Sequence, residues 1–264
     1  MRSEADRMFK TIQANTELTL TIPFEIDGEP VADVHSVEWS VFNEFGQASE
    51  TGMAAPEAGA NSISVVIPAK ANVAERGRPY TTYELAYTLV TKSGRLESSL
   101  VFQVESADAF VEPNNTLVSP LRALSILREI PNLASFAAAT REEQKVALLC
   151  AHNAIASLPL NPKAFPFVRE NEPFTSISQL TKEMWEQLDR RVVSDFQAAQ
   201  VIEANNLLGT TEFKTLREAG VLSYTVGEVK QFLSSNRPLE LGLCRDAMRR
   251  IGRYLDTARR LGRA

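Results

Sequence analysis

Histidine and cysteine are scarce in this chain of 264 residues, which contains two of each. Two cysteines cannot form a disulfide framework. Because Cys150 and Cys244 both lie in apolar helical patterns, we expect two reduced thiols in the core. His152 follows Cys150 by two residues, and on a helix this spacing places the side chains on different faces. The sequence therefore predicts neither a metal site nor a Cys–His nucleophile pair.

Catalytic loop motifs are also missing. The segment 208–211, Leu-Gly-Thr-Thr, lacks the remaining glycine and the lysine of a phosphate-binding loop, and no Gly-x-Ser-x-Gly elbow occurs. The neighbouring carboxylates Glu142 with Glu143 and Glu170 with Glu172 lie in polar stretches, which favours solvated side chains over acid–base pairs. We therefore expect no enzyme activity, no catalytic residue and no cofactor.

Long apolar runs are absent as well. No stretch approaches the ~20 apolar residues that a membrane-spanning helix needs. The opening segment MRSEADRMFK is too charged for a secretory signal. The sequence predicts no contact with a membrane.

Positive charge is concentrated at one end of the chain. Residues 243–264 contain seven arginines, no lysine and two aspartates, a net charge of +5. Since the whole chain carries −5, the other 242 residues carry −10. A uniformly basic nucleic-acid-binding protein would not have this distribution. An acidic body with one basic segment favours docking that is steered by charge.

The first 110 residues have the two-residue period of β-strands. Apolar residues alternate over 16–24, 37–41, 62–68, 83–89 and 100–104, with turn residues between these segments. Such short strands predict an antiparallel β-sandwich, with Trp39 as a core side chain rather than a platform for a sugar or a base. We expect the stretch 46–61 to be an exposed loop, which would either contact a partner or, as we favour, have no role in contacts. The segments Val37–Ser40 and Tyr83–Arg95 resemble the immunoglobulin-like domains of phage virion proteins.

Helical periodicity begins after a linker at 111–116 and indicates a small helical domain over 117–240. Ser119-Pro120 and Thr140 to Glu143 have the pattern of helix N-termini. We expect a central helix over 140–158 that is apolar over much of its circumference. One side is traced by Val146, Leu149, Cys150, Asn153, Ala154 and Ser157 and is widened by Ala147, Leu148, Ala151 and Ile155. A proline-rich excursion then carries Phe165, Phe167 and Phe174 onto the bundle. Further helices are predicted over 181–188, 192–208, 213–219 and 225–235.

Residues 241–264 are predicted to form a basic amphipathic C-terminal helix. Its apolar positions recur at helical spacing, and arginines lie between them. Three interpretations stay open: a helix packed on its own domain with arginines in water, docking onto an acidic partner, and contact with nucleic acid. The candidate partner-binding residues are Arg245, Arg249, Arg250, Arg253, Tyr254, Arg259, Arg260 and Arg263.

The helical part resembles head–tail connector (adaptor) proteins of tailed bacteriophages. The likeness is carried by Glu142–Leu158 (EEQKVALLCAHNAIASL) and by Val192–Leu208 with its Gln200 and Glu203-Ala204. The resemblance implies a virion structural protein that is made in the host cytoplasm and incorporated at the head–tail junction. It also implies a ring beneath the portal, with the twelvefold symmetry typical of the family, and it implies the portal protein, tail or fibre proteins and further copies of itself as partners.

Two alternatives remain. In the first, the protein is a DNA-binding packaging accessory protein, because the positive charge of the basic helix would also suit DNA phosphates. Its single aromatic residue, Tyr254, offers little surface for stacking on bases. The β-domain would instead be the active part of an immunoglobulin-like surface or fibre-attachment protein. DNA contact is the less favoured of the partner predictions.

Overall fold

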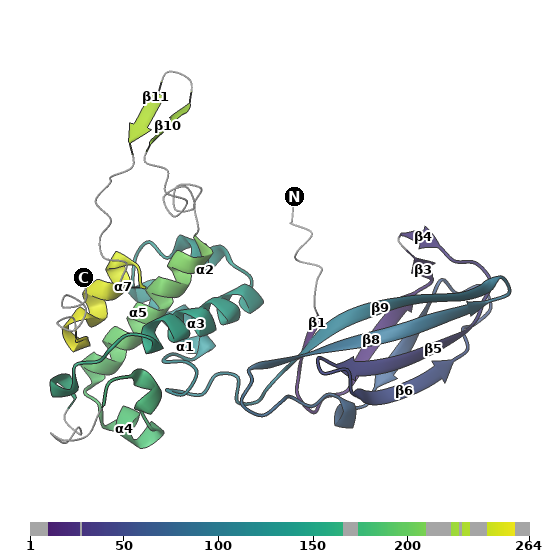
Figure 1. The fold of residues 1–264 in the computed structure, drawn as a ribbon, viewed down its shortest axis with the longest axis horizontal. Helices are drawn as coiled ribbons and strands as arrows, with labels where there is room; N and C mark the ends of the chain where they lie inside the picture. Colours follow the sequence, from purple (N-terminus) through teal and green to yellow (C-terminus); the bar gives the residue numbers. More distant parts are fainter. Residues whose placement is uncertain are drawn as a thin grey trace. The chain divides into compact units, whose positions relative to one another are not determined.

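The computed structural model describes residues 10–26, 28–165, 174–209, 223–226, 229–232 and 242–256. The fold combines β and α structure, and the chain divides into two compact units, Met1–Ala109 and Phe110–Ala264 (Figure 1). Each unit has its own hydrophobic core. We describe the two units separately.

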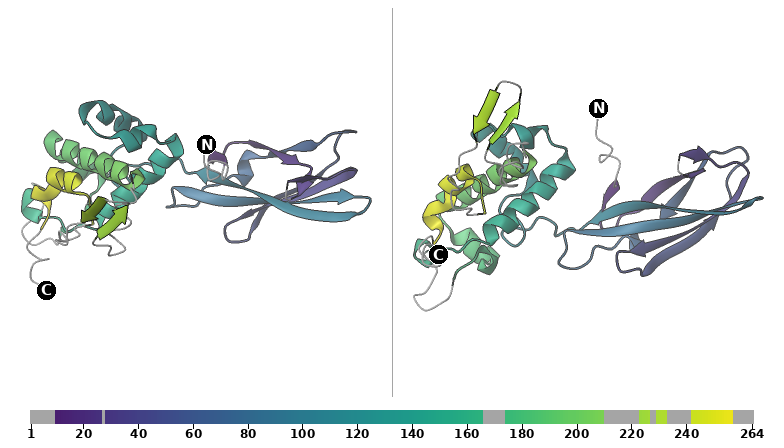
Figure 2. Two further views of the ribbon diagram at one scale, coloured as in Figure 1. Left: turned by 90° about the horizontal axis from the view of Figure 1, so that it is seen from above. Right: turned by 45° about the horizontal axis from the view of Figure 1, so that its top comes forward.

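The first unit is built on a five-stranded sheet in which β1 pairs parallel with β9 and the other pairs are antiparallel. The long strands β8 and β9 twist along their length, as Figure 2 shows. A second sheet contains two strands, and a short hairpin lies between them in sequence. The strand order in the large sheet is β1 (Lys10–Gln13), β9 (Gly94–Glu105), β8 (Tyr80–Thr91), β5 (Val34–Asn43) and β6 (Ala48–Ala54); the small sheets are β2 (Leu18–Pro23) with β7 (Ser62–Ile67), and β3 (Glu25–Ile26) with β4 (Glu29–Pro30).

The predicted two-residue alternation is confirmed on β2 and β8. Leu18, Leu20 and Ile22 are buried while the threonines between them are exposed. On β8 the residues at 83, 85, 87 and 89 are all buried. These side chains belong to a single core with those of β5, β7 and β9, so β2 and β7 cover one face of the large sheet.

Strand β6 lies where the sequence predicted a loop, and that prediction was wrong for residues 48–54. As an edge strand, β6 has no buried face to give it an apolar alternation. Its Gly52 lies beside Trp39, and a Cβ at this glycine would come within 2.3 Å of the indole ring. Trp39 is half-buried and packs against the core from this position, so the expected core role is met in part.

The second unit gathers its helices around α5 (Arg190–Leu208), which contacts α1, α2, α3 and α7 (Figure 1). Its core includes Phe165 and Phe174, as predicted, whereas Phe167 lies outside the described residues. None of the helices in the described ranges has the length and apolar character needed to cross a membrane. The other helices are α1 (Pro120–Glu129), α2 (Ala134–Ala138), α3 (Arg141–Ala156), α4 (Lys182–Gln187) and α7 (Arg245–Ile251).

The predicted helix starts are confirmed by their hydrogen bonds. The Ser119 hydroxyl accepts from the Arg122 N–H at the start of α1. At α3, Thr140 accepts from the Glu143 N–H, and the Glu143 carboxylate accepts from the Thr140 N–H at 2.7 Å. These reciprocal bonds satisfy two N–H groups that the first turn would leave unpaired.

The prediction for α3 is confirmed for the residues that widen its apolar side and is wrong for those that were expected along its middle. Ala147, Leu148, Ala151, His152 and Ile155 face the core, whereas Val146, Cys150 and Asn153 are exposed. The prediction of two core cysteines was therefore wrong for Cys150, and Cys244 is half-buried; both thiols are free. A helix that is apolar around most of its circumference does not reveal from its own sequence which side will be buried.

The prediction of a helix over 225–235 was also wrong. Residues 223–232 contain an antiparallel hairpin, β10 (Ser223–Val226) with β11 (Val229–Phe232). The β-branched Thr225, Val226 and Val229 favour strands over a helix here. The helix predicted over 213–219 lies outside the described residues.

The C-terminal helix is shorter than predicted. Helix α7 ends at Ile251 and continues as the 3-10 turn η5 (Gly252–Tyr254). Leu255 then forms a β-bridge with Leu160, and the Asp256 N–H donates to the Pro159 carbonyl. These contacts require an extended backbone and therefore stop the helix before residue 256.

Candidate docking surface

The apolar side of α7 is used within its own unit. Ala247, Ile251, Tyr254 and Leu255 are buried and belong to the core of the helical unit. A partner that docks on this segment would therefore meet its charged side. Residues 244–256 therefore pack on their own domain, as one of the three interpretations of the basic segment expected.

The described arginines of this segment are all exposed and form what we call the arginine face: Arg245, Arg249, Arg250 and Arg253. Arg249 lies 3.2 Å from Asp246 of the same helix, and Arg253 lies 2.5 Å from Asp195 of α5. Neither Arg245 nor Arg250 forms an ion pair with another described residue. These two guanidinium groups can bind a carboxylate without breaking an internal ion pair.

Tyr254 anchors the segment instead of presenting a docking side chain. Its ring stacks on Phe196 with centroids 5.4 Å apart, and its hydroxyl donates to the Asp195 carboxylate at 2.9 Å. Burial raises the pKa of Tyr254, and the neighbouring Asp195 raises it further. The Arg253 guanidinium covers the same ring at 4.8 Å from its centroid. Because Tyr254 is only 6% exposed, it leaves a partner almost no aromatic surface to stack on.

A second carboxylate of α5 holds the other end of the segment. Glu203 is 3% exposed and accepts hydrogen bonds from the Cys244 N–H at 2.7 Å and from the Asn206 side chain at 3.1 Å. Burial raises the pKa of the Cys244 thiol to about 11, to which Glu203 also contributes. A thiol with such a pKa stays protonated at neutral pH and is a poor nucleophile.

Three of the predicted partner-binding residues, Arg259, Arg260 and Arg263, lie outside the described residues. The structure therefore exposes Arg245, Arg249, Arg250 and Arg253 from the predicted set and buries Tyr254, whose ring is covered by Arg253. In the described ranges, no group of three His, Cys, Asp or Glu side chains could hold a metal ion.

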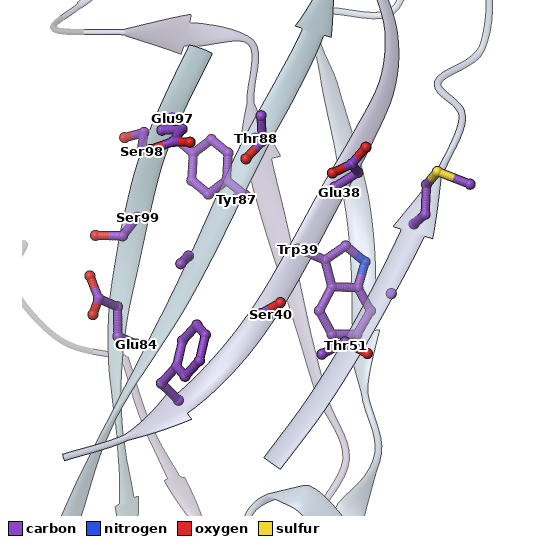
Figure 3. Close-up of a pocket in the computed structure, with 14 residues that line it drawn as sticks. Glu38, Trp39, Ser40, Thr51, Glu84, Tyr87, Thr88, Glu97, Ser98 and Ser99 are labelled. Carbon is purple, nitrogen blue, oxygen red and sulfur yellow. The ribbon is translucent and has the colours of Figure 1, made fainter. Parts of the chain in front are cut away.

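A groove of about 920 Å³ lies on the face of the large sheet opposite the core (Figure 3). The register aligns Glu38 with Thr88 and Thr88 with Glu97 across three strands, so these side chains share this face. Figure 3 shows the carboxylates of Glu38, Glu84 and Glu97 along the groove. The groove is also lined by hydroxyl groups and by the apolar side chains of Phe42 and Met53, but by no lysine or arginine; we call it the acidic groove.

Sequence reasoning missed Asp195, the polar function of Glu203, and the acidic groove. A glutamate inside the apolar stripe of α5 was a signal that this position has a buried hydrogen-bonding partner. The groove could have been found from the solvent-facing positions of three strands, but their pairing register is not visible in the sequence.

No protein-family model, no curated protein and no solved structure matches the chain.

Proposed function

We propose that this protein is a structural subunit of a tailed-phage virion, a head–tail connector that forms a ring under the portal and joins it to the tail. The proposal includes an immunoglobulin-like β-sandwich for residues 1–110, which would face tail or fibre proteins. It rests on the resemblance of the helical part to connector proteins and on the exposed arginine face.

The arginine face is the observation that carries the proposal. Burial of Ala247 and Ile251 fixes the orientation of α7, and Arg245 and Arg250 are exposed on it without an internal ion pair in the described part of the chain. Arginine favours bidentate pairing with carboxylates over simple solvation. Weak contacts of this kind gain affinity when they are repeated around a ring.

The test measures the mass of the portal ring from the same phage with and without this protein. We expect a discrete gain of many copies. A folded protein that adds no mass to the ring would refute the connector function.

Charge reversal then tests the arginine face itself. We expect Arg245→Glu with Arg250→Glu to weaken portal binding at least tenfold, because the new carboxylates would repel an acidic partner. The fold should be kept, since the change breaks no ion pair within the described structure. Arg253 is left unchanged since its loss would disturb Asp195. The matched control is Arg190→Glu with Arg191→Glu, an equal charge change on exposed residues of α5. Equal binding by both variants would show that the arginine face is not part of the docking surface.

Titration with duplex DNA at physiological salt separates the connector from a DNA-binding accessory protein. The connector proposal predicts little affinity for DNA. Tight binding that falls steeply with salt and is lost in the Arg245→Glu, Arg250→Glu variant would favour the packaging function instead.

A further inference from the structure

The acidic groove has the charge and dimensions of a docking surface for an extended basic segment. Its lining contains Glu38, Glu84 and Glu97, and no basic side chain. Arg95 pairs with Glu38 at its edge. Glu84 and Glu97 are exposed and form no ion pair with another residue in the described ranges. Two carboxylates are therefore available to a cationic ligand.

Two apolar side chains lie among the polar groups of this surface. Met53 is 72% exposed beside the groove on the edge strand β6, and Phe42 is half-buried within it. The lining residues come from β6, β5, β8 and β9, four adjacent strands. At about 4.8 Å between strands, the groove crosses roughly 15 Å of sheet.

The chain contains one segment that matches this surface. Residues 257–264, Thr-Ala-Arg-Arg-Leu-Gly-Arg-Ala, follow the last described residue and carry three arginines and one leucine without any acidic residue. Extended at about 3.4 Å per residue, eight residues reach roughly 27 Å. The segment is therefore long enough to cross all four strands.

We infer that residues 257–264 of one copy bind in the acidic groove of a second copy. Charge complementarity selects the occupant, and Asp256, whose N–H is bonded to Pro159, fixes where the segment leaves the helical unit. A contact between the C-terminus of one subunit and the β-unit of the next is heterologous, the kind of contact that closes rings. In this respect the inference rests on the proposed function, since it names the surface through which neighbouring copies would associate.

The test uses a fluorescently labelled octapeptide with the sequence of residues 257–264. The receptor is the full chain with Arg259→Ala, Arg260→Ala and Arg263→Ala, so that its own C-terminal segment does not compete. We expect saturable binding at low salt that weakens at least fivefold in 0.5 M NaCl, because exposed ion pairs are screened. A peptide with glutamine in place of all three arginines should bind at least tenfold more weakly.

Variants of the groove test whether the peptide binds there. Glu84→Gln with Glu97→Gln in the same receptor should weaken binding about tenfold, whereas Glu17→Gln with Glu57→Gln, an equal charge change at exposed positions that do not line the groove, should leave it unchanged. Absence of peptide binding, or equal loss in both double variants, would overturn the inference. The portal is not present in this assay, so its outcome is independent of the portal-binding test of the proposed function.

Discussion

Gln200 is the side chain whose loss we expect to destabilise the helical unit most specifically. It is fully buried and makes three hydrogen bonds. Its carbonyl accepts from the Leu117 N–H at 2.7 Å, and its amide donates to the Thr116 hydroxyl at 3.0 Å and to the Leu148 carbonyl at 2.8 Å. One side chain of α5 thus fixes the segment before α1 and contacts the backbone of α3.

The change Gln200→Leu keeps the volume approximately and removes all three bonds. The Leu148 carbonyl lies within a helix, and the Thr116 hydroxyl still donates to Val118, but the buried Leu117 N–H loses its partner. An unsatisfied buried donor costs about 1–3 kcal/mol, so we expect a loss of about 2 kcal/mol. For a unit of this size that corresponds to a decrease in Tm of roughly 4–8 °C.

The assay is thermal and urea unfolding followed by the fluorescence of Trp185, which is buried in the helical unit. The control is Gln197→Leu, a half-buried position on the same helix for which we expect a change within about 0.5 kcal/mol. Equal stability of the two variants would show that the three hydrogen bonds around Gln200 contribute little.

Three further predictions concern other sites. Burial lowers the pKa of His152, whose Nε2 donates to the Pro113 carbonyl at 3.1 Å. From pH 7.5 to 5.5 the unfolded state gains a proton that the folded state resists, so the stability of the helical unit should fall. His152→Gln should flatten this slope in pH-dependent unfolding. Gly52→Ala should lower the Tm of the β-unit by several degrees in a thermal melt, because its methyl group collides with the Trp39 ring. Thr140→Ala should cost the helical unit about 1 kcal/mol in urea unfolding through loss of the α3 N-cap; an unchanged midpoint would contradict this.

The strands with one buried face were predictable because their pattern and their packing have the same cause. Alternation on β2 and β8 reflects a core on one side and solvent or a groove on the other. Strand β6 has no such contrast, because it lies at the sheet edge and depends on the pairing of Gly52 with Trp39 for its position. This contact joins residues thirteen positions apart, and it produces no periodic pattern of apolar residues in either strand.

The helical unit shows the same limit. Local capping signals located the starts of α1 and α3. The choice of the buried side of α3 depends on α5, which is distant in sequence. The candidate docking surface was predictable as a set of arginines. The burial of Tyr254 was not, since its hydrogen-bond partner Asp195 lies 59 residues away in the sequence.

The return of residues 242–256 to α5 has a consequence for the covalent chain. Glu203 and Asp195 hold this short segment at two points, and Leu255 bridges to Leu160. If the backbone were cut between Gly209 and Gly242, these hydrogen bonds and the buried side chains of α7 would still join the two fragments. The helical unit would then be a complex of two polypeptides.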